Sequence, residues 1–429
     1  MISVSSQVRT RPSWPAIVQP DDFGGVHRRE LAGQVNLDYA ATTPALSAAV
    51  NAVLAVLPAY GSVHRGGGGA RSTITTDAYE AARERVARFV DAGDDHVVVF
   101  VRNTTEAINL VAATLPHPSR VLCSPLEHHA NLLPWRDHDV THLPFAASPT
   151  ELVATTFQTL RTARGSRRPF DLLAVCGASN VTGEVLPLAD LARIAHDAGA
   201  EIIVDAAQLA PHRRISVSEL DLDYLALSGH KLYAPFGTGA LVIRRDRLAA
   251  TAPLLKGGGA VRVVTLDDVA WADLPQRFEA GTPNVLGAVA LAASCDMLDE
   301  HGRDLIEAQE SELAQVLWDG LAELPGCRVL RQWDTGDRVA VATFTLAGRD
   351  PRQVAETLAR DHGIALRSGL FCAHPFVTHL LGAESQTDAA VARARIGGDV
   401  TLPGALRASI GIGVEADDIA QLLSVLHGL

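Results

Sequence analysis

The sequence has few cysteines, few aromatic residues and no long apolar run. Five cysteines among 429 residues are scattered without a CxxC pair. A disulfide framework or a zinc site is therefore not expected, and most of these cysteines should be reduced core residues. No window approaches the uninterrupted apolar stretch that a membrane span needs. We therefore expect neither a disulfide-stabilised nor a membrane-embedded protein, and no metal.

Positive charge is also scarce. The chain has 37 Lys and Arg against 49 Asp and Glu, a formal net charge of −12, and no basic block. Nucleic acid is thus not an expected partner. The first 22 residues lack the apolar core of a signal peptide, so we expect a cytoplasmic protein.

The remaining composition is that of a globular enzyme with two lobes. Apolar residues make up 47% of the chain and charged residues 20%, which suits a chain of this length with a sizeable core. We expect an N-terminal arm (residues 1–35) that joins the small domain, a large domain (36–298) and a small C-terminal α+β domain (299–429).

The large domain is predicted to hold a mainly parallel sheet. Short β-branched runs alternate there with amphipathic helical stretches, which is typical of a sheet wrapped by helices. The strands are expected at His96–Val101, Arg120–Ser124, Asp171–Cys176, Glu201–Asp205, Tyr224–Ser228 and Gly239–Arg244.

Helices are predicted between these strands and after them. They are expected at Asp77–Val90, Thr105–Thr114, Leu188–Ala198 and Ile306–Leu324. The last third of the chain predicts a strand at Arg338–Thr345, a helix at Pro351–His362 and a final helix from Asp417.

Polar residues follow most of the large-domain strands. In open α/β sheets, ligands bind beyond the carboxyl ends of the strands, so these residues mark the expected binding site.

Lys231 comes directly after one of these apolar strands and the residues Ser-Gly-His. A lone lysine is more often a solvated charge. At this place, however, it should point into the strand-end rim, where a desolvated amine has a lowered pKa and becomes nucleophilic. We interpret Lys231 as the reactive amine.

Asp205 closes the apolar run Glu-Ile-Ile-Val-Asp. A buried carboxylate needs a cation or several donors, and a pyridinium nitrogen would serve. Gln208, one helical turn further on, could then reach a ring hydroxyl. The alternative is that Asp205 only caps the next helix.

Thr104 and Thr105 lie where a strand becomes a helix. Free backbone N–H groups, two hydroxyls and the helix dipole there favour a phosphate, although a plain threonine cap is an alternative. Ser228 and His230 could add donors from a second loop. His128 could stack on a planar ligand or be a surface histidine beside His129, and its position in the sequence does not decide between them.

Cys372 lies in a glycine-bearing loop flanked by arginine and histidine. This setting suits a thiolate nucleophile better than a core strand does, but a free cysteine is often an inert hydrophobe. Arg407 is a candidate to grip a substrate carboxylate with its two-pronged guanidinium, against the alternative of a surface ion pair.

Together these motifs resemble the class V, fold-type I enzymes that depend on pyridoxal 5′-phosphate (PLP). Within that class they are most similar to group II cysteine desulfurases and selenocysteine lyases. The resemblance runs from about residue 37 to the C-terminus. It rests on Leu37–Thr43, Val63–Gly66, Asn103–Ala107, Glu127–Asn131, Ser179–Gly183, Asp205–Gln208, Ser228–Lys231, Gly281–Pro283, the Cys372 loop and Arg407–Ser409.

The resemblance implies a large domain with a mainly parallel seven-stranded sheet and a smaller α+β domain. It implies that Lys231 holds PLP as a Schiff base and removes the Cα proton, while Cys372 attacks the substrate's sulfur and leaves alanine as product. His128 would be a third catalytic residue. The implied cofactor-binding residues are Thr104, Thr105, His128, Asp205, Gln208, Ser228, His230, Lys231 and, from the second subunit of a homodimer, Thr282.

The implied substrate-binding residues are Asn180, Arg407, Arg367 and His64. The expected partners are a small amino-acid substrate, a second copy of the chain and a sulfur-acceptor protein.

The sequence departs from the desulfurase pattern around the substrate. Leu370 and Phe371 stand where two histidines are usual, and Gly68 and Ala260 replace a histidine and a glutamate. Gly411–Val414 replaces a Tyr-Asn segment. The expected reaction is cleavage of the Cβ–S or Cβ–Se bond of cysteine, selenocysteine or a cysteine conjugate. The alternatives are a class V aminotransferase or epimerase of specialised metabolism without sulfur transfer, or a non-catalytic protein of this fold that binds a partner.

Overall fold

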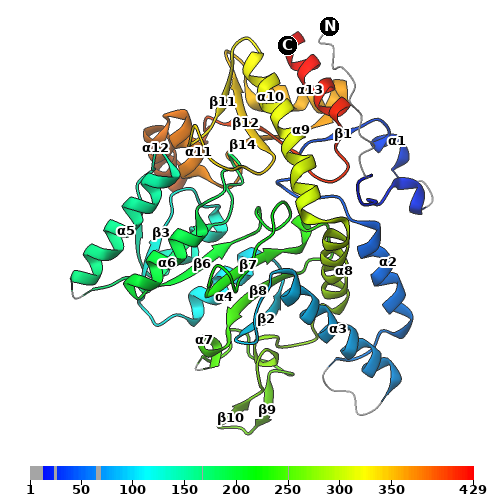
Figure 1. The fold of residues 1–429 in the computed structure, drawn as a ribbon, viewed down its shortest axis with the longest axis vertical. Coiled ribbons are helices and arrows are strands. Elements are labelled where there is room, and N and C mark those ends of the chain that lie inside the picture. The colour runs from blue at the N-terminus through cyan, green and yellow to red at the C-terminus, as the bar shows by residue number, and fades with distance from the viewer. Residues whose placement is uncertain (1–12, 24–26, 64–68, 167, 250) are drawn as a thin grey trace.

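The computed structural model describes residues 13–429 except 24–26, 64–68, 167 and 250. A sheet of seven strands forms the centre of the large domain (Figure 1). Its order is β2-β8-β7-β6-β5-β3-β4, and only β8 runs antiparallel to its neighbours. The strands are β2 (His96–Val101), β3 (Arg120–Cys123), β4 (Asp139–His142), β5 (Leu172–Cys176), β6 (Glu201–Asp205), β7 (Tyr224–Ser228) and β8 (Gly239–Arg244).

The central strands are buried on both faces, so they read as continuous apolar runs. Along β6, Ile202 and Val204 join one hydrophobic cluster and Ile203 joins the other. Helix α4 (Thr104–Thr114) covers the second face, while α5 (Pro149–Gly165) and α6 (Leu188–Ala198) pack on the first.

Three helices flank this sheet near β2 and β8 (Figure 1). They are α2 (Ser47–Val56), α3 (Ala70–Phe89) and α8 (Val285–His301). A hairpin of β9 (Val261–Val264) and β10 (Val269–Trp271) projects from the large domain.

The small domain has a four-stranded antiparallel sheet of order β11-β12-β15-β14. These strands are β11 (Cys327–Leu330), β12 (Val341–Leu346), β15 (Ala405–Ser409) and β14 (Arg367–Gly369). Its helices are α9 (Arg303–Glu323), α10 (Pro351–His362), α11 (His374–Leu381), α12 (Glu384–Arg395) and α13 (Ala416–Gly428). Near the start of the chain, β1 (Val35–Asn36) pairs in parallel with β13 (Ile364–Ala365).

The predicted fold class is confirmed, including the mainly parallel seven-stranded sheet. The seven predicted strands agree with the structure to within one residue at each end, except that β12 begins three residues later than predicted. The other strands were not predicted, and among them β4 is the one that belongs to the large sheet. β4 is an edge strand with no buried residue, so it has no apolar run to mark it. Helix α3 begins seven residues before its predicted start, because the threonine-rich stretch Arg71–Thr76 has weak helix propensity and hides its first turns. The division of the chain at residues 35 and 298 stays a prediction.

No helix in the described ranges is long and apolar enough to cross a membrane.

Candidate active site

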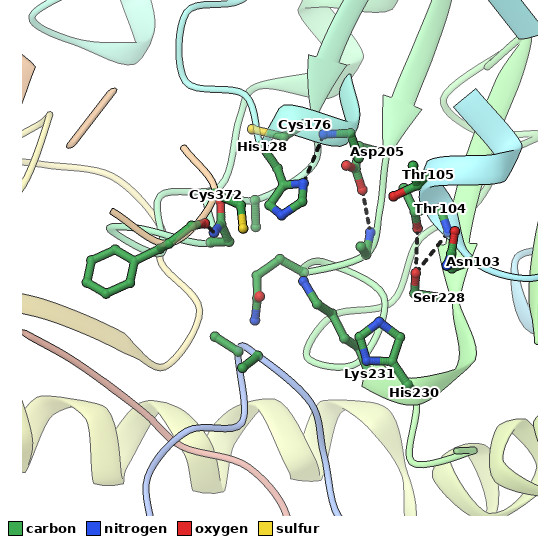
Figure 2. A pocket seen from close by; sticks show the side chains of 18 of the residues that line it. Asn103, Thr104, Thr105, His128, Cys176, Asp205, Ser228, His230, Lys231 and Cys372 are labelled. Carbon is green, nitrogen blue, oxygen red and sulfur yellow. Dashed lines mark hydrogen bonds between the residues drawn. The ribbon is translucent and has the colours of Figure 1, made fainter. Parts of the chain in front are cut away.

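A cavity of about 550 Å³ opens at the carboxyl ends of the large-domain strands, between the two domains (Figure 2). Residues from both domains line it, as expected for an open α/β sheet. Twelve of the predicted site residues lie in this lining, and nine of them come from the large domain: Thr104, Thr105, His128, Asn180, Asp205, Gln208, Ser228, His230 and Lys231. The other three, Arg367, Cys372 and Arg407, border the same cavity from the small domain.

Lys231 and Asp205 face this cavity from two neighbouring strand ends (Figure 2). Lys231 follows β7 in a short 3₁₀ turn, and Asp205 is the last residue of β6. Burial lowers the pKa of Lys231 to about 8, although the charge of Asp205 opposes this shift. Burial also raises the pKa of Asp205, while the N–H of Ala207 and the charge of Lys231 lower it. The amine is therefore far easier to deprotonate than an ordinary lysine.

An anion niche forms at the N-terminus of helix α4. Asn103 caps the helix by accepting a hydrogen bond from the Glu106 N–H at 3.1 Å. The Ser228 hydroxyl accepts from the Thr104 N–H at 2.9 Å and lies 2.9 Å from the Thr104 hydroxyl. Thr105 is exposed at the mouth of the niche. The helix dipole and these donors together make the position favourable for a phosphate.

Gly239, the first residue of β8, packs directly against the backbone at the start of the anion niche, where a side chain would not fit. A Cβ on Gly239 would lie 2.8 Å from the Asn103 Cα and 2.4 Å from the Leu227 carbonyl oxygen. Glycine therefore lets the start of α4 approach the sheet closely enough to share its hydrogen bonds with Ser228.

His128 and Gln208 present polar atoms to the cavity. The Ala130 N–H donates to His128 Nδ1 at 3.0 Å, and burial lowers the pKa of His128 to about 3. Its ring is therefore neutral at ordinary pH, which suits stacking on a planar ligand. The Oε1 atom of Gln208 is buried and has no hydrogen-bond partner among the described residues, so it can accept a hydrogen bond from a ligand.

Arg407 lies on β15, lines the cavity and is 2% exposed. It donates to the Asn180 carbonyl at 2.9 Å and lies 3.3 Å from an Asp38 oxygen. Arg367 also pairs with Asp38, at 2.7 Å. The Nε atom of Arg407 has no partner in the described part of the chain. A buried guanidinium with a free donor can still take a carboxylate, and the interpretation of Arg407 as a surface ion pair is wrong.

The Cys372 loop is held by contacts with the large domain. The Asn180 side chain donates to the Phe371 carbonyl at 2.9 Å, and the His129 N–H donates to the Cys372 carbonyl at 2.7 Å. Phe371 and Cys372 both have positive φ, 51° and 54°, a conformation that non-glycine residues seldom adopt. Cys372 itself is exposed, and burial as an inert core residue is thus excluded for it.

Two predicted residues do not line this cavity. Thr282 borders an adjoining hollow of about 1000 Å³ that shares Asn103 and Thr105 with the first. His64 lies outside the described residues.

The sequence did not single out Asp38 or His129. Asp38 joins Arg367 and Arg407. His129 also accepts from the His374 N–H at 3.3 Å, and the two rings meet edge to face at 4.6 Å. Asp38 lies within the motif 37–43 and His129 within the motif 127–131. Their contacts at the cavity, however, are made with residues more than 240 positions away in the sequence, and a sequence motif does not show such contacts.

Comparison with known proteins places the chain among desulfurase-like sequences. Residues 35–422 match the family model described as aminotransferase class-V. The chain is 38% identical to a probable cysteine desulfurase of Halalkalibacterium halodurans over 358 residues, 81% of this chain and 86% of the relative. It is 37% identical to cysteine desulfurase CsdA of Escherichia coli over 358 residues, with the same shares.

Solved structures agree with this similarity. The apo structure of a cysteine desulfurase from Thermococcus onnurineus NA1 superposes with a TM-score of 0.80 at 30% identity, covering 96% of this chain and 98% of that one. The crystal structure of Escherichia coli CsdA in an S-sulfonic acid form gives a TM-score of 0.77 at 33% identity, with the same coverage.

Proposed function

This chain belongs to the class-V aminotransferase family, and on that premise we propose that it is a PLP-dependent cysteine desulfurase. It would cleave the Cβ–S bond of cysteine, the Cβ–Se bond of selenocysteine, or the same bond in a cysteine conjugate. The observation that carries the proposal is the meeting, in one cavity, of Lys231, Asp205, the α4 anion niche and the loop of Cys372.

The residues around the cavity fit PLP. The α4 niche with Ser228 and His230 suits its phosphate, Asp205 its ring nitrogen, and the unpartnered Gln208 oxygen its ring hydroxyl. His128 would stack on the ring and Lys231 would bind the carbonyl carbon. When bound, PLP withdraws electrons from the Cα of an amino-acid substrate.

Lys231 would serve as the base at Cα. With a pKa of about 8, its amine is partly uncharged near neutral pH and can accept the Cα proton. Arg407, with its free Nε donor, and Asn180 would hold the substrate carboxylate. Arg367 and His64 are proposed to contribute to substrate binding beside Arg407 and Asn180.

Cys372 would take the sulfur. Its thiolate forms an S–S bond with the substrate's sulfur as the Cβ–S bond breaks. The electron pair of the broken bond passes to the carbon skeleton, which takes up a proton and leaves as alanine. The enzyme keeps a persulfide, which a sulfur-acceptor protein or a thiol would remove.

A second copy of the chain is proposed to complete the site. The hollow beside the cavity contains Thr282 and shares Asn103 and Thr105 with it, so a partner subunit placed there would reach the phosphate niche. Sedimentation of the purified protein as a dimer would support this arrangement.

The test is a substrate panel of cysteine, selenocysteine, S-alkyl cysteines and cysteine sulfinate, with detection of sulfide, selenide and alanine. We expect alanine from cysteine and an added sulfur on Cys372 by intact mass. The Cys372→Ala variant should form no alanine from cysteine and should show no added sulfur by intact mass, while it still binds PLP. Full turnover by this variant would instead indicate a C–S lyase that needs no thiol. Amino transfer dependent on a keto acid, without sulfide, would indicate an aminotransferase.

A further inference from the structure

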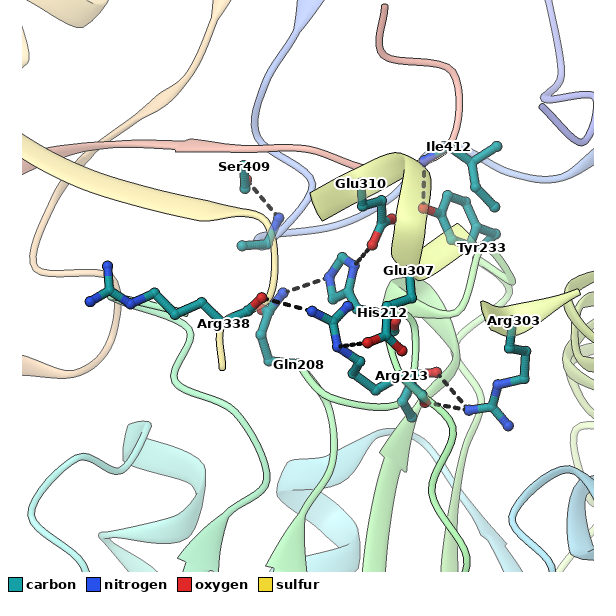
Figure 3. A network of polar contacts seen from close by, with 12 residues as sticks. Gln208, His212, Arg213, Tyr233, Arg303, Glu307, Glu310, Arg338, Ser409 and Ile412 are labelled. Atoms are coloured by element: carbon teal, nitrogen blue, oxygen red, sulfur yellow. Dashed lines mark hydrogen bonds and ion pairs between the residues drawn. The ribbon is translucent and has the colours of Figure 1, made fainter. Parts of the chain in front are cut away.

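A buried chain of three polar side chains leads from the cavity into the small domain (Figure 3). Gln208 Nε2 lies 3.1 Å from His212 Nε2, and His212 Nδ1 lies 2.8 Å from Glu310 Oε2. Gln208 and His212 are each 4% exposed, and Glu310 is fully buried. Gln208 lines the cavity, whereas His212 and Glu310 do not.

Local structure brings the three together. The segment after β6 forms helical turns, in which the Ala210 N–H donates to the Ala206 carbonyl and the Arg213 N–H to the Leu209 carbonyl. Residues four apart on such turns lie on one face, so Gln208 and His212 are neighbours. Glu310 comes from α9, the long helix that begins the small domain (Figure 3).

The Gln208 amide turns its NH₂ group toward His212, with its Nε2 atom 3.1 Å from His212 Nε2. An amide NH₂ group can only donate, so His212 Nε2 accepts this hydrogen bond. The other ring nitrogen, Nδ1, then carries the ring proton and donates it to Glu310 Oε2. The carbonyl oxygen of Gln208 is thus left over, and it is the buried oxygen without a partner among the described residues.

No other group competes for Glu310 in the described part of the chain. Arg213, next to His212, pairs instead with Glu307 at 3.1 Å. The hydroxyls of Tyr39 and Tyr233 bond to the backbone of Ile412. Burial first, and the Glu310 charge among other causes, raise the pKa of both tyrosines, so they stay neutral. His212 is therefore the polar partner through which Glu310 acts.

We propose that His212 and Glu310 are positioning residues that hold the Gln208 amide with its carbonyl oxygen toward the ring hydroxyl of the cofactor. The inference rests on the proposed function, because it requires PLP in the cavity. An acceptor beside the ring oxygen disfavours negative charge on that oxygen and favours the protonated form of the bound cofactor. Without His212 and Glu310, the amide is free to turn and offer its NH₂ group, which has the opposite effect.

The experiment is a pH titration of the visible absorption band of the bound cofactor, without substrate, in Glu310→Gln and His212→Leu. We expect the midpoint of the titration to fall by about half a pH unit or more, about threefold in proton affinity. Glu310→Gln keeps the shape of the side chain, so it remains informative if His212→Leu folds poorly. Thermal unfolding of the cofactor-free proteins records the change in stability.

Matched controls separate positioning from general damage. Glu184→Gln alters another fully buried glutamate, which accepts from the Gln332 N–H at 2.7 Å outside the cavity. His96→Leu alters another buried histidine, which lies 2.9 Å from Asp95 at the far end of β2. Both should titrate as the unaltered protein does, whatever stability they lose.

A double-variant comparison tests whether the effect passes through Gln208. In a Gln208→Ala background, Glu310→Gln should cause no further shift, because coupled residues are not additive. Unshifted midpoints in both single variants, or an equal shift in the Gln208→Ala background, would overturn the inference and leave the pair as a structural link between domains. Failure of the unaltered protein to form a visible band with PLP would overturn the proposed function itself.

Discussion

Burial controls the ionisation of the side chains around the cavity. It lowers the pKa of Lys231 to about 8, of His128 to about 3 and of Arg407 to about 10. At neutral pH the imidazole is therefore uncharged, the guanidinium stays charged and the amine is close to its titration point. These states suit stacking, carboxylate binding and proton transfer respectively.

The lowered pKa of Lys231 predicts how cofactor attachment depends on pH. Only the uncharged amine attacks a carbonyl, so the attachment rate should rise with pH up to about 8 and level off above it. Stopped-flow absorbance after mixing cofactor-free protein with PLP measures this rate. In Asp205→Asn the break should move to lower pH, because the Asp205 charge raises the pKa of the amine. A break near the ordinary lysine value of about 10.4 would contradict the prediction.

Asp205→Asn should also separate cofactor binding from turnover. The α4 niche is unaltered in this variant, so PLP should still bind. The rate should fall about 100-fold or more, because a fixed charge that stabilises the reacting system is lost. Steady-state alanine formation measures the rate. Asp223→Asn is the control, because Asp223 is also buried but accepts from the Ile202 N–H at 2.8 Å, outside the cavity. Equal rates for Asp205→Asn and the unaltered protein would contradict the proposed role.

At the scale of elements, helix α4 and strand β7 act together. The first helical N–H of α4, that of Thr104, has no partner within the helix and is satisfied by Ser228 at the end of β7. The helix start and the strand end are thereby joined at the proposed phosphate position.

Ser228→Ala should weaken PLP binding. Loss of this hydroxyl leaves the buried Thr104 N–H without its partner and removes a donor from the niche, a cost of about 1–3 kcal/mol. The dissociation constant should rise about tenfold or more, as measured by absorbance titration. Ser294→Ala removes a buried hydroxyl that has no partner in the described chain, and it should bind PLP normally. An unchanged constant in Ser228→Ala would show that this hydroxyl is not part of the phosphate site.

The loop after β14 was only partly predictable. Its glycine, arginine and histidine marked it as a setting for a reactive cysteine. The left-handed backbone of Phe371 and Cys372 could not be predicted from their residue types, because non-glycine residues ordinarily avoid that conformation. That conformation depends on Asn180 and His129, which hold the two carbonyl groups from the other domain.

At the scale of the whole molecule, the domains meet closely near Gly183. Its carbonyl accepts from the Val339 N–H at 2.8 Å. Its φ is +81°, and a Cβ there would lie 2.5 Å from the Val339 carbonyl oxygen. A side chain would therefore push apart the backbones that join the domains.

Gly183→Ala should destabilise the protein more than Gly199→Ala does. Gly199 has a similar φ of +83° but no atom within 4 Å of its Cβ position. Both variants bear the cost of a left-handed alanine, about 1–2 kcal/mol. Gly183→Ala adds the clash with Val339, so its midpoint in urea unfolding should be the lower of the two. Equal urea midpoints for the two variants would contradict the prediction, because they would mean that the backbone near Val339 can shift to accommodate the added methyl group at little cost.

The sequence alone determined six strands of the large sheet, the places where they end and the residues proposed to carry the chemistry. Alternation of apolar runs and amphipathic helices is a local signal, and a reactive side chain at a strand end has a predictable place. Only the tertiary structure decided that Asp38 joins Arg367 and Arg407, that His129 holds the Cys372 loop and that Glu310 reaches His212. Those contacts unite residues far apart in the chain, and no local pattern encodes the distance between two side chains that meet only after the domains have packed.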